Sequence, residues 1–488
     1  MPTPVNPSGL QYIDGLLWGY KWDFTNLLYS FPATKDDYLI SGYPNAFPNG
    51  GIFEFEAMNS TQIGLLEKVV RNFDDVCNIT LTFTNAPGAG NIRYGEATAL
   101  NYFSSDPFDP RWKAPGSPTP PGTAEANIPD PAFPAFAQGD VWFNHEFYNA
   151  PEIGSFFFAG GLLHETGHAL GLKHGHQTND NNGVTYPMLP AQFDSQEYSI
   201  MTYSAFVGGG PNSGARDAEF PSTIMMLDIL ALQYMYGADY TTRAGNTIYK
   251  WNPATGESFV DGVGQGATFH GKILETIWDG GGKDTFDFSN YKTNVVCDLQ
   301  PSGWSTPSSA QIANLGGSGN PHFARGSIAT ALLFNGNPAS LIENATGGSG
   351  NDKIFGNIAN NTFHGNGGND TLEGFAGADT LYGGKGHDKF VFEALADSTV
   401  KGFGRDTIKD FSHADDIVLK AIDANTHMRG NQAFTFHSNF THHAGEIQYD
   451  RQSANSFLVT LDVNGDAKAD AAFIVKGATD LLKTDFIL

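Results

Sequence analysis

The run HETGHALGLKH at residues 164–174 contains side chains that could hold a catalytic metal ion. His164 and His168 are four residues apart, so on a helix their imidazoles lie on one face, about one turn from each other. Two neutral imidazoles in this arrangement can occupy two corners of the tetrahedron that zinc prefers. Glu165 lies beside them, where its carboxylate can reach a water molecule on the metal. The run therefore predicts a zinc site that has its own base.

A third ligand can come from His174 if the helix ends before it. Gly171 permits this, because glycine adopts the positive φ that ends a helix and turns the chain back. Three histidines leave one position open for water, as catalytic rather than structural zinc requires. A bare HExxH also occurs by chance on surface helices, but this longer pattern uses three of only 14 His in the chain. His145 and His176 could ligate a metal by type; spacing favours His174, and we expect both to be ordinary polar loop residues.

Downstream, the run SIMTY places Met201 and Tyr203 after the third histidine. With the extended HExxHxxGxxH run, it resembles the metzincin metalloproteases, in which a methionine turn follows the active-site helix. The resemblance implies that Met201 forms an apolar floor beneath the ligands, a role that suits a thioether. It also implies that Tyr203 is an extra zinc ligand, as in astacins and serralysins, and a donor to the oxyanion of the reaction. A packed loop tyrosine is the alternative.

Composition limits the partners and the compartment. The chain has 52 Asp+Glu against 27 Lys+Arg, a net charge of −25, which argues against nucleic acid and anionic membranes as partners and suggests that many aspartates face cations. We find neither a long apolar run nor a basic segment followed by an apolar core, so we expect no membrane span and no Sec signal. Cys77 and Cys297 are expected to be buried free thiols.

A chain of 488 residues is long enough for two or three domains. We expect residues 1–22 to be a leader or propeptide, residues 23–250 an α/β protease domain, and residues 251–488 a calcium-binding β-roll. Hydrophobic periodicity predicts helices at 61–77 and 221–237, an active-site helix from about residue 154, and strands at 27–32, 78–85, 91–95 and 139–144. Residues 104–138 are expected to be a surface loop. The metzincin resemblance implies that strand 139–144 is an edge that pairs with extended substrate.

The second half of the chain repeats every nine residues from Gly347: GGSGNDKIF, GNIANNTFH, GNGGNDTLE, GFAGADTLY, GGKGHDKFV. This is the GGxGxDxUx nonapeptide that builds a calcium-binding parallel β-helix. Glycines allow tight turns with exposed carbonyls, and the aspartate adds a hard carboxylate, so each turn presents the oxygen ligands that calcium prefers. A flexible glycine linker has no reason to keep its apolar residues in phase. The 58 glycines of the chain fit such turns.

If two repeats complete one coil, equivalent positions are 18 residues apart. Asp352 then stacks on Asp370 and Asp370 on Asp388, with calcium between the carboxylates. The eighth position of each repeat faces inward, which places Ile354, Leu372 and Phe390 in one column and Phe363 and Leu381 in another. The second repeat has Ala359 and Asn361 in place of glycine and aspartate, so we expect its site to be weak.

The metzincin helix, SIMTY and the repeats together resemble the serralysins, secreted bacterial metalloproteases of the repeats-in-toxin type. The resemblance implies an α/β metzincin catalytic domain, with a mixed twisted sheet and active-site helices, followed by an all-β parallel β-roll. It implies calcium ligands at Arg243, Gly245, Thr247, Asp279, Gly281, Gly282, Asp284, Glu343, Gly348, Gly350, Asp352, Gly365, Gly367, Asp370, Gly374, Ala376, Asp379, Gly383 and Asp388. The Asp-rich residues 461–470 are either one more site or a turn.

The chain ends with Asp485 and three apolar residues, which resembles the uncleaved signal of type I (ABC) exporters. We expect a secreted, extracellular monomer whose acidic roll folds only in millimolar calcium outside the cell. Its partners are then polypeptide substrates, the exporter and, as is common in this family, a small proteinaceous inhibitor.

The predicted function is zinc-dependent endoproteolysis with Glu165 as general base. A calcium-dependent secreted binding or surface-layer protein is the alternative class, but it has no use for three ligands and a base. A narrower alternative is a processing protease with one target.

Overall fold

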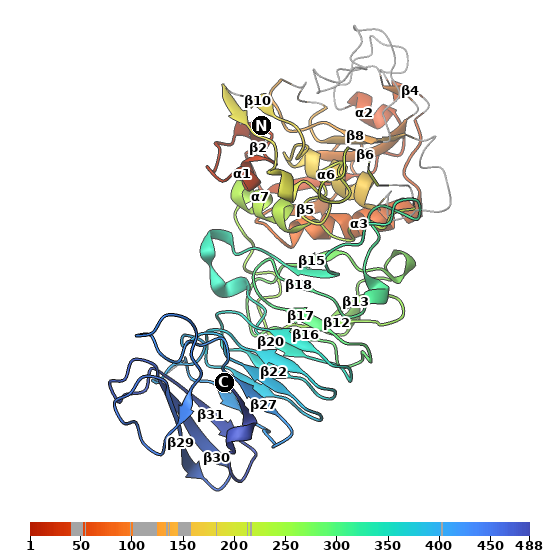
Figure 1. Ribbon diagram of the computed structural model, residues 1–488. Helices are drawn as coiled ribbons and strands as arrows, with labels where there is room; N and C mark the ends of the chain where they lie inside the picture. The colour runs from red at the N-terminus through yellow and green to blue at the C-terminus, as the bar shows by residue number, and fades with distance from the viewer. Residues whose placement is uncertain are drawn as a thin grey trace. The chain divides into compact units, whose positions relative to one another are not determined.

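The computed structural model describes residues 1–40, 52–53, 55–97, 99–100, 124–132, 135, 137–144, 158–181, 183–211, 213–214, 217–401 and 404–488. They form two compact units, drawn in Figure 1. The first unit comprises Met1–Thr242, Leu274–Trp278 and Ala313–Arg325, and the second comprises Arg243–Ile273, Asp279–Ile312 and Gly326–Leu488. In the part of the chain that the structure describes, no helix is long and apolar enough to cross a membrane.

The first unit is built on a five-stranded mixed sheet with the strand order β5-β3-β6-β9-β8. Its strands are β3 (Asn26–Ser30), β5 (Thr80–Phe83), β6 (Ile92–Ala97), β8 (Ala124–Ala126) and β9 (Asp140–Asn144). The first four in this order are parallel, and β8 runs antiparallel to β9. Strands β6 and β9 are buried along their whole length, as is typical of inner parallel strands that are covered on both faces.

Strand β8 corrects two predictions. The stretch 104–138 was expected to be a loop, but its residues 124–126 form a strand; residues 101–123 lie outside the described residues. The predicted strand at 139–144 is not an edge, because β8 pairs with β9 and is itself the outermost strand. The sequence Ala-Glu-Ala contains no β-branched or aromatic residue, so local propensity gives no sign of this strand.

Most helices in the described part of the first unit are short. The helices are α1 (Gln11–Asp14), α2 (Asp36–Ile40), α3 (Ser60–Asp74), α6 (His164–Ala169), α7 (Met226–Tyr236), the π-helix η2 (Phe158–Leu163) and the 3₁₀ turn η3 (Ala191–Phe193). Helix α3 confirms the prediction for 61–77: the side chain of Asn59 accepts from the amide of Gln62, whose own side chain accepts from the amide of Asn59. Helix α7 confirms the prediction for 221–237 but starts later, at Met226.

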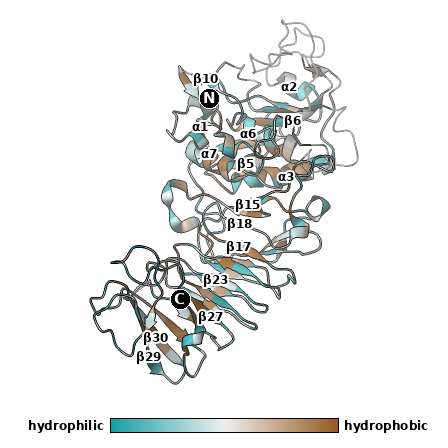
Figure 2. Cartoon of the chain, viewed as in Figure 1, coloured by the Kyte–Doolittle hydropathy of each residue, from teal (hydrophilic) through white to brown (hydrophobic). Residues whose placement is uncertain are grey.

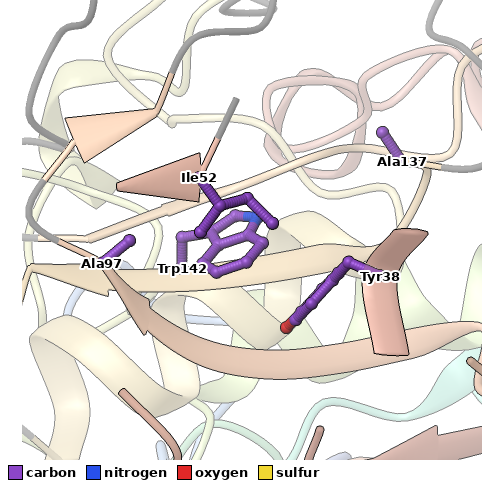
Figure 3. Packing of buried hydrophobic residues seen from close by; sticks show 5 residues of the cluster. All are labelled: Tyr38, Ile52, Ala97, Ala137 and Trp142. Atoms are coloured by element: carbon purple, nitrogen blue, oxygen red, sulfur yellow. The ribbon is translucent and has the colours of Figure 1, made fainter. Parts of the chain in front are cut away.

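A cluster of buried side chains covers the sheet on the side of α2 (Figure 3). Its members are Tyr38, Ile52, Ala97, Ala137 and Trp142, with Phe55 packed against them. The rings of Tyr38 and Trp142 are 4.5 Å apart between centroids. Gly95 lies beneath them, where a Cβ atom would be 2.8 Å from the Tyr38 hydroxyl, so only glycine leaves room for this packing.

Residues 1–22 pack around the chain that links the predicted metal ligands. Strands β1 (Pro2–Pro4) and β2 (Tyr20–Trp22) form an antiparallel pair. The amide of Trp18 donates to the carbonyl of Gly171 at 3.1 Å, and the indole of Trp22 donates to the carbonyl of Ala169 at 2.9 Å. The segment therefore supports the active-site helix; its role as a leader stays a prediction.

The remaining strands of the first unit are short. Strand β4 (Ile52–Phe53) pairs with β7 (Ala99–Leu100), and β10 (Asn179–Asn181) pairs with β11 (Val184–Tyr186). Strand β15 comprises Glu275–Ile277.

The second unit contains two long sheets of mostly parallel strands. One has the order β14-β13-β12-β16-β20-β22-β24-β26-β31-β30-β29-β28, and the other has the order β17-β21-β23-β25-β27-β32. Between the two ends, strands from the two sheets alternate along the chain, which is the arrangement of a β-roll. Figure 2 shows apolar residues along these strands and polar residues in the turns between them. The prediction of a roll is confirmed.

The strands of the first long sheet are β12 (Ile248–Trp251), β13 (Ser258–Val260), β14 (Val263–Gly264), β16 (Thr285–Asp287), β20 (Asn344–Thr346), β22 (Thr362–His364), β24 (Thr380–Tyr382), β26 (Thr407–Ile408), β28 (Thr435–Phe436), β29 (Glu446–Ser453), β30 (Ser456–Asp462) and β31 (Ala471–Lys476). Those of the second are β17 (Val296–Asp298), β21 (Lys353–Phe355), β23 (Thr371–Glu373), β25 (Lys389–Val391), β27 (Asp416–Val418) and β32 (Phe486–Ile487). Strands β18 (Trp304–Ser305) and β19 (Ile328–Thr330) are antiparallel neighbours outside these two long sheets. The 3₁₀ turns are η4 (Phe269–Gly271), η5 (Ser309–Gln311), η6 (Phe334–Gly336), η7 (Pro338–Ser340) and η9 (Lys483–Asp485).

The roll is not uniform to its ends. Strand β13 is antiparallel to β12 and β14, and β30 is antiparallel to β29 and β31. The nine-residue repeat is absent from these segments, and antiparallel hairpins are found there in place of the parallel coils.

The register of the repeats agrees with the predicted spacing of 18 residues. Ile354 pairs with Leu372 and Leu372 with Phe390, while Phe363 pairs with Leu381 on the other side. All five side chains are fully buried. The predicted inner columns are therefore confirmed. Both cysteines are free and buried, as expected.

Candidate metal centre and active site

The active-site helix changes its winding immediately before the first ligand. Residues 158–163 form the π-helix η2, and residues 164–169 continue as the α-helix α6; the predicted start near residue 154 lies outside the described residues. π-Helical turns occur mostly as single turns at functional sites. Gly171 has a φ of +102°, and a Cβ atom there would lie 2.5 Å from the carbonyl oxygen of Tyr20. This glycine turns the chain after the helix, as predicted, and lets His174 approach the other ligands.

The three predicted histidine ligands converge on one point. The Nε2 atom of His168 lies 3.1 Å from that of His164 and 3.0 Å from that of His174. The Nε2 atoms of His164 and His174 are 3.1 Å apart. Among the described residues, this is the one group of at least three His, Cys, Asp or Glu side chains whose ligand atoms are close enough to share a metal ion.

The hydrogen-bond partner of Nδ1 determines which ring nitrogen of each imidazole carries the proton. Nδ1 of His164 lies 2.7 Å from the carbonyl oxygen of Ile200, and Nδ1 of His168 lies 2.8 Å from that of Leu172. Nδ1 of His174 lies 3.1 Å from Oε1 of Gln177. Because these oxygens can only accept, each Nδ1 carries the proton and each Nε2 presents a lone pair.

Three converging lone pairs cannot hydrogen-bond to one another, so the donor set fits a cation. Burial lowers the pKa of His164 to about 4 and that of His168 to about 3, and it holds the pKa of His174 well below its usual range. All three imidazoles are therefore neutral at physiological pH, which is the state that binds a metal. Three imidazole nitrogens in this arrangement are the ligand set of a catalytic zinc site.

Glu165 is buried on helix α6 next to the first ligand. Burial raises its pKa well above the usual range, and the negative charge of Glu125 on β8 adds to this effect. Helix α6 packs against β8 and β9. A carboxyl group in such a dry position is a strong proton acceptor when ionised.

The methionine turn lies beneath the helix. Met201 is fully buried, and a Cβ atom on Gly167 would lie 2.7 Å from its sulfur, so the thioether packs directly against α6. The carbonyl of Met201 accepts from the amide of Gly175 at 3.0 Å. This turn also supplies the carbonyl of Ile200 that orients His164.

Tyr203 lies at the open side of the ligand cluster. Its ring is 4.5 Å from that of His174 and 5.8 Å from that of His164, measured between centroids, and 40% of the residue is exposed. His176, which was expected to be an ordinary polar loop residue and not a ligand, is not part of the converging group but lies next to it. Its ring lies 5.2 Å from that of His174 and 4.6 Å from that of Tyr203. His145 lies outside the described residues.

Two further residues of the site were missed by sequence reasoning. Asp228 on α7 is fully buried and accepts from the hydroxyl of Ser199 at 2.6 Å and the amide of Ile200 at 2.8 Å. Lys173 is 1% exposed, although it lies between two ligands in the chain. A single charge inside the apolar run MLDILAL was the available signal for Asp228. The sequence offered no comparable signal for Lys173.

The predicted calcium ligands near the start of the second unit form one connected cluster. The amide of Thr247 donates to the Asp284 carboxylate at 2.8 Å, and the amide of Asp284 donates to Glu343 at 2.8 Å. Asp279 accepts from the amide of Gly281 at 2.8 Å and from Tyr249. The carbonyls of Arg243 and Gly245 accept from the Thr247 hydroxyl at 3.3 and 3.2 Å, and Gly282 packs against Gly245.

The aspartates of the repeats stack as predicted. The amide of Asp352 donates to the Asp370 carboxylate at 2.8 Å, and that of Asp370 donates to Asp388 at 2.9 Å. In the other row, the amide of Asn361 donates to Asp379 at 2.7 Å. The turns that carry these residues lie on one another and include Gly348, Gly350, Gly365, Gly367, Gly374, Ala376 and Gly383.

Four aspartates of these clusters each have one buried carboxylate oxygen that has no hydrogen-bond partner among the described residues. These are the Oδ2 atoms of Asp284, Asp370, Asp379 and Asp388. Burial raises the pKa of Asp370 to about 7, of Asp379 to about 8 and of Asp388 to about 6. Buried anionic oxygens without a donor fit a hard cation such as calcium.

Three converging imidazoles with an adjacent buried carboxylate are typical of a metallohydrolase. Residues 238–488 match the sequence profile of the family described as peptidase M10 serralysin C terminal. The chain is 33% identical over 463 residues to metalloprotease AprA of Pseudomonas entomophila strain L48, covering 92% of this chain and 84% of the relative. It is 31% identical over 482 residues to serralysin of Photorhabdus luminescens, covering 96% and 87% of the two chains. For serralysin of Proteus mirabilis the identity is 32% over 478 residues, covering 93% and 87%.

The chain therefore belongs to the serralysin family, and it is a metalloendopeptidase. This excludes the alternative of a secreted binding or surface-layer protein without catalytic activity.

Proposed function

We propose that this metalloendopeptidase is secreted and hydrolyses extracellular proteins with one zinc ion, held by His164, His168 and His174. The observation that carries the proposal is the convergence of three Nε2 lone pairs beside a buried carboxylate. When bound, zinc supplies a Lewis acid that lowers the pKa of a water molecule towards ~7.

Glu165 is the general base. Its carboxylate takes a proton from the attacking water and then delivers it to the amine that leaves from the cleaved peptide. Burial keeps bulk water away from this carboxyl group, so the proton stays within the site. Tyr203, whose ring contacts His174, would be an additional zinc ligand, and its phenol would donate a hydrogen bond to the oxyanion that forms on the substrate. Met201 supports the ligands from below.

The second unit binds several calcium ions through the turns described above, and these ions stabilise it. The four buried carboxylate oxygens without partners support this proposal. The second repeat is the exception. The Asn361 side chain donates to the carbonyl of Glu343 at 2.8 Å, so its position is satisfied without a cation. In residues 461–470, the Asp462 carboxylate accepts from the amides of Gly465 and Ala467, which favours a turn.

Export by a type I (ABC) apparatus and control by a small proteinaceous inhibitor remain part of the proposal. The C-terminal strand β32 pairs with β27, and Asp485 is buried beside it. Asp485 and Phe486 of such a signal are therefore more accessible before the second unit folds, which fits export of an unfolded chain. Mass spectrometry of the secreted protein tests whether residues 1–22 stay attached.

Replacement of the base tests the mechanism. We expect Glu165→Ala to abolish cleavage of casein and of a quenched fluorescent peptide, while one zinc ion per chain remains bound after dialysis, as measured by atomic absorption. Full activity of this variant would refute the assignment of Glu165. Cleavage profiling on a peptide library distinguishes a broad endopeptidase from a processing enzyme with one target.

A further inference from the structure

We infer that His176 is a positioning residue that holds Tyr203 against the metal ligands. The inference rests on the proposed function of Tyr203 as ligand and oxyanion donor. His176 contacts Tyr203 through its ring, and the ring of Tyr203 in turn contacts a metal ligand.

The rings of His174, His176 and Tyr203 each contact the other two. The imidazoles of His174 and His176 are nearly parallel, at 19°, with centroids 5.2 Å apart. Tyr203 lies against both, 4.5 Å from His174 at 52° and 4.6 Å from His176 at 35°. Tyr203 is 40% exposed. On its covered side, the two imidazoles limit the directions in which its ring can turn.

The backbone around His176 is held on both sides. The amide of Gly175 donates to the carbonyl of Met201 at 3.0 Å, and the carbonyl of Gly175 accepts from Leu189 at 2.7 Å. On the other side, the carbonyl of Gln177 accepts from the Lys173 ammonium at 2.6 Å. Because its backbone is held in this way, the His176 ring has a fixed position against Tyr203. A ring on a loosely held loop would not restrict the tyrosine.

The structure does not support a role for His176 as a metal ligand. In the described part of the chain, the group of at least three ligand atoms that lie within 4.8 Å of one another comes from His164, His168 and His174, and His176 is not a member of it. Nδ1 of His176 is buried and has no hydrogen-bond partner in the described part of the chain. Its contacts with His174 and Tyr203 are ring–ring contacts, at interplanar angles of 19° and 35°.

A donor that stabilises an oxyanion is effective only when it is held in place before the reaction. Without His176, one of the ring contacts that hold Tyr203 is lost, and fewer molecules have the phenol placed for the reaction. We therefore expect kcat to fall more than KM changes, and zinc content to stay at one ion per chain, because each of the three histidines keeps its own Nδ1 contact.

The test uses the full-length enzyme loaded with zinc and calcium, in four variants: His176→Ala, His176→Phe, Tyr203→Phe and the double variant His176→Ala/Tyr203→Phe. Zinc content, the thermal midpoint, kcat and KM for a quenched fluorescent peptide are measured for each. We expect H176A to lower kcat on the order of 10-fold and H176F to restore most of it, because phenylalanine keeps the ring face. In the Y203F background, H176A should change kcat by less than about 2-fold, because the effects of two coupled residues on kcat do not add.

Three results would overturn the inference: an H176A enzyme with unchanged kcat, an H176F enzyme as slow as H176A, or additive losses in the double variant. The second result would assign the effect to an imidazole N–H instead of the ring face. A fully active Y203F enzyme would overturn the proposed role of Tyr203 and the inference with it. An impaired Y203F enzyme beside a fully active H176A enzyme would overturn the inference alone.

Discussion

The carboxylate of Asp228 accepts a hydrogen bond from the backbone amide of Ile200 at 2.8 Å, and this contact ties helix α7 to the methionine turn. The carbonyl of the same residue, Ile200, accepts from Nδ1 of His164 at 2.7 Å. His164, the first proposed metal ligand, is thus oriented by a turn that a buried carboxylate on another helix holds in place. Outer contacts of this kind fix the tautomer and the direction of a ligating imidazole.

We predict that Asp228→Asn weakens zinc binding by about 10-fold, because an amide cannot accept all three of the hydrogen bonds that the carboxylate receives from Ser199, Ile200 and Met225. Competition with a chromophoric chelator measures the affinity. Ser199→Ala, which removes one donor and leaves the carboxylate, is the control and should have a smaller effect. Equal zinc affinity in the wild type and in D228N would show that the turn does not depend on Asp228.

The calcium-free second unit should lose stability as the pH rises. Burial raises the pKa of Asp370 to about 7 and that of Asp379 to about 8, from an ordinary value of 3.8. Between pH ~4 and ~8 the folded unit then holds more protons than the unfolded chain, so its free energy of unfolding falls as the pH increases. Bound calcium should remove this dependence, because it replaces the protons.

Thermal unfolding of the inactive E165A protein from pH 4 to 8, with and without calcium, measures this effect without self-digestion. A midpoint that rises with pH in the calcium-free protein would contradict the prediction.

Lys173→Met should destabilise the first unit by about 3 kcal/mol, because a buried ammonium group that donates to several carbonyls is lost and its acceptors are left without a donor. Its Nζ atom donates to the carbonyls of Gly15 and Gln177 at 2.6 Å and to that of Pro187 at 2.9 Å. Urea unfolding measures the change. Lys468→Met is the control, since the Lys468 side chain is 81% exposed and its ion pair should contribute little. An equally stable K173M protein would rule out this role.

Asn361→Asp should make the second repeat depend on calcium. The Asn361 amide donates to the carbonyl of Glu343 and to Asn357 at 2.8 and 3.2 Å, whereas a carboxylate can only accept there. We expect a lower thermal midpoint without calcium and recovery when calcium is added. Asn361→Ala is the control, because it removes the same donor without adding a charge. If calcium rescued both variants equally, the aspartate would not have created a site.

The sequence alone determined the parts of this protein whose residues are close in the chain. His164, Glu165 and His168 share one helix, and one glycine turn brings His174 back to them, so their spacing was sufficient to predict the triad. The nine-residue repeat likewise predicted the inner columns of the roll, because each strand pairs with its equivalent 18 residues away.

Only the tertiary structure decided which distant residues support the site. It placed Asp228 behind the methionine turn, and it surrounded the Lys173 ammonium with carbonyls from separate segments of the chain. It also brought His176 against Tyr203 and added β8 outside the strand expected at the edge. None of these contacts has a periodic pattern in the sequence, because each depends on how separate segments pack around the active-site helix, and local propensity carries no information about that packing.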